Sequence, residues 1–409
     1  HQYAGNKGDR AVAFAMCLLL KQVAPEVEIT ISTSSPELWN GVTFFENNKI
    51  KFIPNSWDFE HVERNRIYWA LLNKIRKYTF TIQRESFVLF GGCGMCRFLV
   101  NPLFYKAVKV SDLVLSVGGH HFTTLLSRDL VSTINYDAMS VLLLGKKLSC
   151  FSQTFGPFEF YNKRNLLLTQ KILSSCEALY VREKSSIKSL FQLHIPSETI
   201  HEVHESVIYL NALFNNYVSP SKREKKIGIA IYATQRRSPE ILERYIQVFA
   251  EGVKHFIQKG FQVVFFPMEL KNSGPDDRPL IQRIMQVIGA DKECCRYVDV
   301  DMGTEQHLYE VSKCRFFIGH KTHSTIFALT SGTPLIGIAY HPKTREFMSQ
   351  FDVEDYCIDD ADLTADVLIC KAEHLLENMD AIGEQTFQKA RKCKAQLEKC
   401  MSSLINTLK

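Results

Sequence analysis

A short stretch in the C-terminal part of the chain combines residue types that bind anions and exchange protons. Lys321 and His323 stand between an apolar run that ends at Ile318 and a segment with helical spacing that starts at Ser324. A helix N-terminus offers free backbone N–H groups and a partial positive charge. Lys321 adds a full positive charge, and His323 adds an imidazole, a group that can exchange protons near neutral pH. The pattern indicates an anion pocket beside an acid/base, whereas the alternative is a solvated helix start without a function.

The segments around these residues predict a β-α-β unit. Arg315–Ile318 and Pro334–Ala339 are short apolar runs with β propensity, and Ser324–Ser331 has helical spacing. Gly332 suits the left-handed residue that ends many helices. Residues that follow the first strand of such a unit lie at the carboxyl edge of a parallel sheet, where open α/β proteins bind ligands.

Four other turns carry residues that could contact a ligand at the end of a strand or the start of a helix. Arg182 follows a strand predicted at Ala178–Val181, although it could instead form a surface salt bridge with Glu183 or Glu205. Glycines in such turns let the backbone approach a ligand closely. The remaining candidates are Asn6, Gly8 and Asp9 in the turn Gly5–Asp9, Gly118, Gly119 and His120 after Leu113–Val117, and Gln153 and Gly156 after Leu148–Ser152. We expect Asp9 to cap the helix that follows the first turn.

The chain is too long for one ordinary core, since it has 409 residues. The alternation of strands and helices predicts an α/β protein with two Rossmann-like domains that face a cleft. We place the N-terminal domain at residues 1–217, the C-terminal domain at 218–380 and a helical tail at 381–409. The polar stretch Asn215–Lys226 is the expected linker. The turns of the first domain and Arg182 would then lie opposite Lys321 and His323.

Residues 61–110 form a basic and aromatic segment, with nine Lys and Arg against two Glu. One interpretation is an amphipathic segment near a membrane surface or a lipid-carried substrate. The alternative is a helical hairpin that packs its aromatic side chains on the domain and exposes its charges to solvent.

Composition and charge limit the function classes. The 49 basic and 44 acidic residues give a net charge of +5, which is only mildly basic. Since the sequence also has no nucleic-acid-binding motif, binding to nucleic acid is not favoured. No apolar run approaches the ~18 residues of a membrane helix. The 12 cysteines include one C-x-x-C pair, Cys93 and Cys96, and zinc sites usually need a second pair. We expect a reduced, cytoplasmic protein without a structural metal.

The order of the motifs resembles the polysaccharide pyruvyl transferase family over nearly the whole chain. The family pattern has an arginine where this chain has Lys321, which keeps the charge but loses the bidentate fork, and a third glycine where it has His120. The matching segments are Asn6–Asp9, Val117–Gly119, Gln153–Pro157, Val181–Ser186, Lys321–Ala328 and Tyr340–Lys343.

The resemblance implies a glycosyltransferase-B-like fold and transfer of the pyruvyl group of phosphoenolpyruvate to a sugar of a polysaccharide or glycan precursor, giving a pyruvate ketal. Arg182, Lys321 and the helix start at Ser324 would hold the donor, and His323 would be the general acid/base. Asp9 and Glu205 are weaker candidates for contacting the acceptor hydroxyls. Neither a metal nor a cofactor is expected. The basic aromatic segment could approach a polymeric or lipid-linked glycan, and a peripheral membrane contact is a further expectation. The implied substrate-binding residues are Asn6, Gly8, Asp9, Gly118, Gly119, His120, Gln153, Gly156, Ser324, Tyr340 and Lys343.

Two other functions remain open at this point. A nucleotide-sugar-dependent glycosyltransferase of the same fold would need a carboxylate near the second-domain helix to bind ribose, and Gly319–Ser331 contains none. A non-catalytic glycan-binding relative is favoured by the replacement of the family arginine with Lys321.

Overall fold

The computed structural model describes residues 6–39, 42–58, 66–91, 99–125, 127–129, 131, 133–232, 238–270 and 276–407. The chain divides into two compact units. Unit 1 contains Met16–Ser206 and the end of the chain from Glu398, and unit 2 contains the described residues up to Ala15 together with Val207–Leu397. The boundary that we placed between residues 217 and 218 lies inside unit 2.

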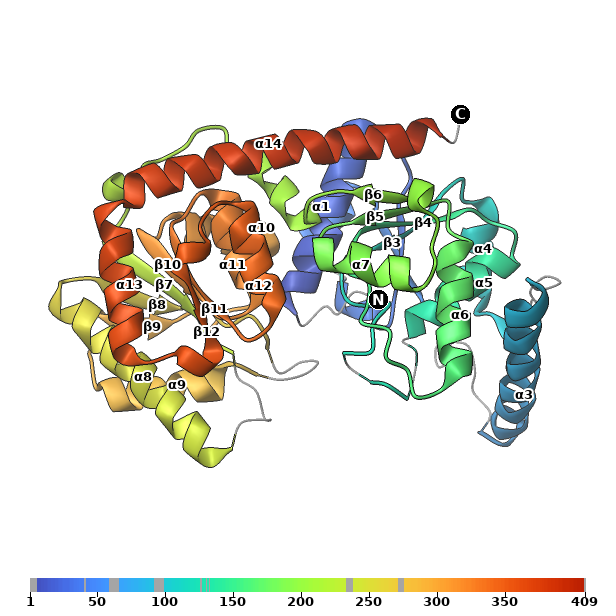
Figure 1. The fold of residues 1–409 in the computed structure, drawn as a ribbon, viewed down its shortest axis with the longest axis horizontal. Helices are drawn as coiled ribbons and strands as arrows, with labels where there is room; N and C mark the ends of the chain where they lie inside the picture. The colour runs from blue at the N-terminus through green and yellow to red at the C-terminus, as the bar shows by residue number, and fades with distance from the viewer. Residues whose placement is uncertain are drawn as a thin grey trace. The chain divides into compact units, whose positions relative to one another are not determined.

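Unit 1 is built on a parallel four-stranded sheet in chain order, β3-β4-β5-β6, and has a separate parallel pair, β1-β2 (Figure 1). The central strand β4 is buried along its whole length. The strands are β1 Thr30–Thr33, β2 Lys51–Pro54, β3 Val114–Val117, β4 Leu148–Gln153, β5 Ala178–Val181 and β6 Ile200–Glu202. The α-helices are α2 Thr43–Asn47, α3 Arg66–Phe90, α4 Pro102–Val110, α5 Thr133–Leu143, α6 Lys163–Ser174 and α7 Lys184–Gln192.

One predicted strand of this unit is partly wrong. The sequence predicts a strand from His201 to Val207, but β6 ends at Glu202 and Ser206 begins a 3-10 helix. The backbone N–H of Ser206 donates to the Ser152 hydroxyl rather than to a neighbouring strand. At Ser206 a bond to a side chain therefore takes the place of a backbone bond between strands, which periodicity does not indicate.

Unit 2 is built on a six-stranded parallel sheet with the order β12-β11-β10-β7-β8-β9. Successive strands run outward from β7 on one side and from β10 on the other, so the order reverses between these two central strands. In open parallel sheets such a switch point leaves a crevice at the carboxyl ends of the two strands. The strands are β7 Lys226–Ala230, β8 Gln262–Phe265, β9 Cys295–Tyr297, β10 Phe316–Gly319, β11 Leu335–Ala339 and β12 Cys357–Asp359.

Helices cover this sheet (Figure 1). The predicted helix end at Gly332 is confirmed, because this residue is left-handed with a φ of 63°. The apolar pattern of Tyr297–Val300 predicts a strand there, but the strand lies earlier: β9 ends at Tyr297 and Val300 is exposed. The helices are α8 Pro239–Gln258, α9 Arg278–Ile288, α10 Thr304–Ser312, α11 Thr322–Ser331, α12 Pro342–Gln350 and α13 Ala365–Glu377.

Two helices contribute to both units. The first half of α1 (Lys7–Val23) belongs to unit 2 and the rest to unit 1, and α14 (Met379–Asn406) passes from unit 2 to unit 1 at Glu398. Among the described residues no helix combines the length and apolar character needed to cross a bilayer.

Candidate functional site

Lys321 lies at the switch point of the unit 2 sheet. It follows the end of β10 and occupies the N-cap position of α11. The preceding peptide, that of His320, donates to the carbonyl of Ala230 at the end of β7, with an N–O distance of 2.9 Å. The predicted placement of Lys321 and His323 after a central strand, at the carboxyl edge of a parallel sheet, is therefore confirmed.

The ammonium of Lys321 is held by two carboxylates. Its Nζ lies 3.0 and 3.1 Å from the two oxygens of Asp277 and 3.0 Å from Oε2 of Glu269. Asp277 is fully buried and also accepts the backbone N–H groups of Met268 and Glu269. The ring of Tyr232 lies 5.6 Å from the same ammonium. Lys321 thus joins α11 to the loop that follows β8.

The N-terminal turn lies in the same unit, beside Lys321 and His323. The Asn6 side chain donates to Oε1 of Glu269 at 3.1 Å, so one carboxylate contacts both Asn6 and Lys321. A Cβ added to Gly8 would lie only 2.4 Å from Cγ and Nδ1 of His323. We expected this turn in the N-terminal domain, across a cleft from Lys321, whereas the structure places it in unit 2. Gly5 lies outside the described residues.

The cap of α1 is Asn6 rather than Asp9. The Asn6 Oδ1 atom accepts the N–H groups of Gly8 at 2.8 Å and of Asp9 at 3.3 Å. Asn and Asp are comparable as N-caps. The prediction that Asp9 caps this helix is therefore wrong, and residue type alone does not distinguish the two positions.

Lys7, between two predicted site residues, was not predicted to have a role. It is 3% exposed, and its Nζ lies 3.4 Å from Nδ1 of His307. Burial lowers the pKa of Lys7 to about 8, although Asp301 opposes the shift. Burial also holds the pKa of His307 well below its ordinary value, and the charge of Lys7 adds to this effect. Arg10 forms a bidentate pair with Asp301 at 2.8 and 2.7 Å.

The remaining predicted residues of unit 2 surround the start of α11. Ser324 is buried and donates its hydroxyl to the carbonyl of Lys321 at 2.6 Å. The Tyr340 ring is 42% exposed and lies 4.4 Å from the ring of Tyr232. Lys343 is buried near the start of α12. The site thus combines a cation, an imidazole and two tyrosine rings at one edge of the sheet.

A second cluster of predicted residues lies in unit 1 around Arg182. This side chain is 3% exposed and forms ion pairs with Glu205 and with Glu183. It also donates to the hydroxyl of Thr154, at 2.9 and 3.0 Å, and to the carbonyl of Gly119 at 3.2 Å. Burial lowers the pKa of Arg182, but the negative charges of Glu205 and Glu183 outweigh the effect of burial, so the pKa of Arg182 is raised overall.

Three predicted turns therefore converge in unit 1. Gly118, Gly119 and Gly156 all have positive φ, at 56°, 73° and 75°, and Gln153 donates to the Ser116 hydroxyl. His120 is exposed on the first of these turns. The alternative prediction, a surface salt bridge of Arg182 with Glu183 or Glu205, has the correct partners, but the structure shows that these ion pairs are buried.

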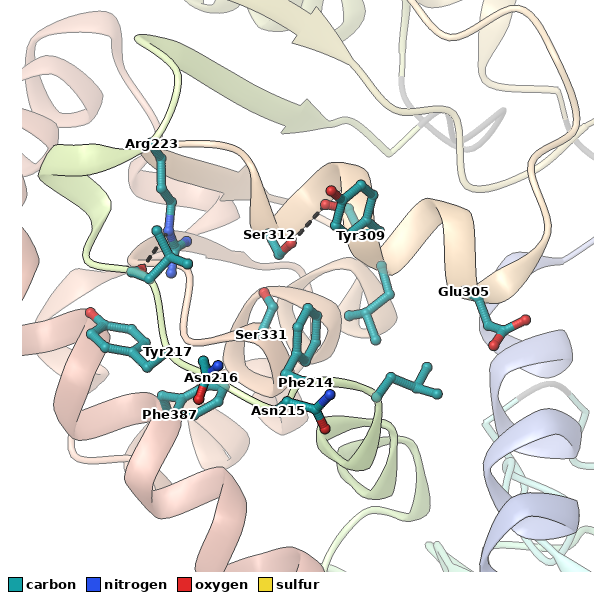
Figure 2. A pocket seen from close by; sticks show the side chains of 13 residues that line it. Phe214, Asn215, Asn216, Tyr217, Arg223, Glu305, Tyr309, Ser312, Ser331 and Phe387 are labelled. Carbon is teal, nitrogen blue, oxygen red and sulfur yellow. Dashed lines mark hydrogen bonds between the residues drawn. The ribbon is translucent and has the colours of Figure 1, made fainter.

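Unit 2 also contains a cavity of about 390 Å³ that involves none of the predicted site residues (Figure 2). Its lining residues are Leu213, Phe214, Asn215, Asn216, Tyr217, Val218, Arg223, Glu305, Leu308, Tyr309, Ser312, Ser331 and Phe387. No cluster of three or more His, Cys, Asp or Glu side chains suited to a metal occurs among the described residues. Cys93 and Cys96 lie outside them.

Comparisons with known proteins agree with this architecture. A family model described as polysaccharide pyruvyl transferase matches residues 6–342. Amylovoran biosynthesis protein AmsJ of Erwinia amylovora is 21% identical over 399 residues, which are 93% of this chain and 92% of that protein.

Solved structures with low sequence identity share the fold. UDP-GlcNAc 2-epimerase from Neisseria meningitidis, bound to UDP-GlcNAc, aligns with a TM-score of 0.60 at 11% identity, over 98% of each chain. A putative UDP-N-acetylglucosamine 2-epimerase from Listeria monocytogenes aligns with a TM-score of 0.57 at 14% identity, over 94% of this chain and 89% of the other. The predicted glycosyltransferase-B-like α/β fold is confirmed.

Proposed function

Because the chain belongs to the polysaccharide pyruvyl transferase family, we propose that it transfers the pyruvyl group of phosphoenolpyruvate to a sugar of a polysaccharide or glycan precursor, giving a pyruvate ketal. The observation that carries this proposal is that the segment Asn6–Asp9 contacts the segment Lys321–Ala328 at the switch point of the unit 2 sheet. Asn6 and Lys321 contact the same carboxylate of Glu269, and Gly8 lies against His323.

The donor would bind at Lys321 and the N-terminus of α11. Phosphoenolpyruvate carries a phosphate and a carboxylate, and a helix N-terminus with an adjacent ammonium suits such groups. Asp277 is buried beneath Lys321, whereas the Glu269 side chain is 17% exposed. The donor anion would therefore take the place of Glu269 at the ammonium, while Asp277 keeps Lys321 in position.

His323 is the candidate general acid/base. It lies in the first turn of α11, two residues after Lys321, and is partly exposed. A proton delivered to the methylene carbon of the donor makes the neighbouring carbon electrophilic, and a sugar hydroxyl attacks that carbon. Phosphate then leaves as a second hydroxyl of the same sugar closes the ketal, and the protons released by the two hydroxyls return to the base and the phosphate.

Arg182 fits a positioning role better than direct contact with the donor. Its guanidinium is buried among Glu183, Glu205, Thr154 and Gly119, which leaves little capacity for a ligand. We assign it to holding the Gly118–Gly119 turn and the turn after β4. Glu205 belongs to the same buried network, which argues against contact with an acceptor hydroxyl.

The test is incubation with phosphoenolpyruvate and a panel of glycans, scored by phosphate release and by a mass gain on the sugar. Both signals together are the expected result, and both should disappear with His323→Ala. Turnover of a nucleotide sugar instead would support a glycosyltransferase of the same fold. Glycan binding without turnover of either donor would support a non-catalytic relative, and both of these outcomes would overturn the proposal.

A further inference from the structure

The outer face of α3 in unit 1 carries a row of exposed apolar side chains. Ile75, Tyr78, Ile82 and Leu89 are 48%, 73%, 53% and 68% exposed. Spacings of three, four and seven residues place side chains on one face of a helix. These residues therefore form a continuous stripe, which we call the α3 stripe.

The opposite face of α3 packs into unit 1. Phe87 belongs to the buried core cluster of this unit, and the partly buried Phe80 packs against that cluster. The Phe80 ring lies edge-on to the ring of Tyr136, with 4.9 Å between their centroids. Figure 1 shows α3 lying along α6, in agreement with the contacts between these two helices. The core face thus orients the helix and directs the α3 stripe away from the protein. This packing agrees with the interpretation that the basic aromatic segment buries aromatic side chains on the domain.

The two helices α3 and α6 are strongly basic in composition. Together α3 and α6 contain eight Lys and Arg and one acidic residue, Glu85, a net charge of +7. The whole chain has a net charge of +5, so the remaining residues are net negative. Glu85 is itself paired with both Arg84 and Arg164. Lys74 is exposed next to the stripe.

We propose that the α3 stripe lies on the surface of a membrane that contains anionic lipids. Apolar side chains on one face, with Lys and Arg around them, are the features by which a helix binds in the plane of such a surface. The apolar side chains enter the boundary between headgroups and acyl chains, and the basic side chains attract the lipid phosphates. The charge excess selects a membrane over a second copy of this chain, because two such faces would repel each other.

The experiment is flotation of the purified full chain with vesicles. We expect binding to vesicles of phosphatidylcholine mixed with phosphatidylglycerol, weak binding to phosphatidylcholine alone, and a decrease as salt is raised. Replacing Tyr78 and Leu89 together by serine should lower the partition coefficient at least about tenfold, because apolar area is lost from the surface contact. Both side chains are largely exposed, so far-UV circular dichroism and the melting temperature should stay unchanged.

The matched control replaces Tyr309 and Ile241 by serine. These residues are 57% and 52% exposed but lie in unit 2, and their loss should leave vesicle binding unchanged. The proposal is overturned if the wild-type chain does not bind anionic vesicles, or if both double variants bind like the wild type. It is also overturned if the α3 variant loses only self-association in size-exclusion chromatography. None of these measurements needs turnover, so their outcome is independent of the proposed pyruvyl transfer.

Discussion

Replacing Gly8 by alanine tests whether the start of α1 holds the imidazole of His323 in place. The added Cβ would lie 2.4 Å from Cγ and Nδ1 of His323 and 2.9 Å from its Cβ. Non-bonded carbon atoms prefer a separation of about 3.5–4.0 Å. The two groups must therefore move apart by about 1 Å or more.

The geometry also indicates what must move. The clash involves Cβ and Cγ at the root of the His323 side chain, so rotation of the ring about its own axis cannot relieve it. Either the imidazole changes its χ1 rotamer or the start of α1 shifts, and Asn6 and Lys7 anchor that start to Glu269 and Met268. A misplacement of about 1 Å at a reacting group can lower a rate ~100-fold.

The assay is phosphate release from phosphoenolpyruvate with an acceptor glycan, compared with the melting temperature of each variant. We expect Gly8→Ala to lower turnover ~100-fold with a much smaller change in stability. Gly303→Ala is the control, since a Cβ there meets nothing within 4 Å and the residue lies in the same unit. Full turnover by Gly8→Ala would refute the inference that α1 positions His323.

Three further substitutions probe the two clusters. His323→Ala should lower turnover at least ~100-fold at an unchanged melting temperature, as expected for a lost general acid/base, and near-normal phosphate release would remove His323 from that role. Arg182→Met should lower the free energy of unfolding in urea by ~3–5 kcal/mol, because it leaves Glu183 and Glu205 buried without a counter-charge. Unchanged stability with lost turnover would instead favour direct contact with substrate. The pKa of Lys7 is lowered from 10.5 to about 8 in the folded protein. Between pH 8 and about 10.5 the unfolded state therefore binds more protons than the folded state, and the free energy of unfolding rises with pH. Lys7→Met should therefore be more stable than the wild type near neutral pH by up to about 3 kcal/mol, and this difference should disappear between pH 8 and about 10.5. A difference that does not change with pH in urea titrations would contradict the lowered pKa of Lys7.

The sequence pattern is sufficient to predict those elements whose structure is determined by a few consecutive residues. The strand at Ala178–Val181 coincides with β5, and Gly332 ends α11 as predicted. In both cases the signal is confined to a few consecutive residues: an apolar run in the first, and a residue that accepts positive φ in the second. The carboxyl-edge position of Lys321 follows in the same way from a strand that leads directly into a helix.

Partners far apart in the chain could not be predicted in this way. The position of Asp277 just before a helical segment predicts an N-terminal turn, but its carboxylate contacts Lys321 and the backbone of the loop after β8. The choice depends on the strand order, which brings the end of β8 near the end of β10 and which hydrophobic periodicity does not encode. For the same reason the sequence identified Glu183 and Glu205 as partners of Arg182 but not the buried setting of the pairs.

The replacement of the family arginine by Lys321 has a physical explanation in the carboxylates around it. An ammonium has three N–H donors, and three carboxylate oxygens of Asp277 and Glu269 lie 3.0–3.1 Å from Nζ. A guanidinium holds its donors in a fixed planar fork, whereas the ammonium is a compact charge whose three donors can turn toward these three oxygens. Lysine thus matches the acids that this chain supplies, and the charge at the start of α11 is retained. The departure from the family pattern is therefore compatible with a working anion site rather than evidence that the site has been lost.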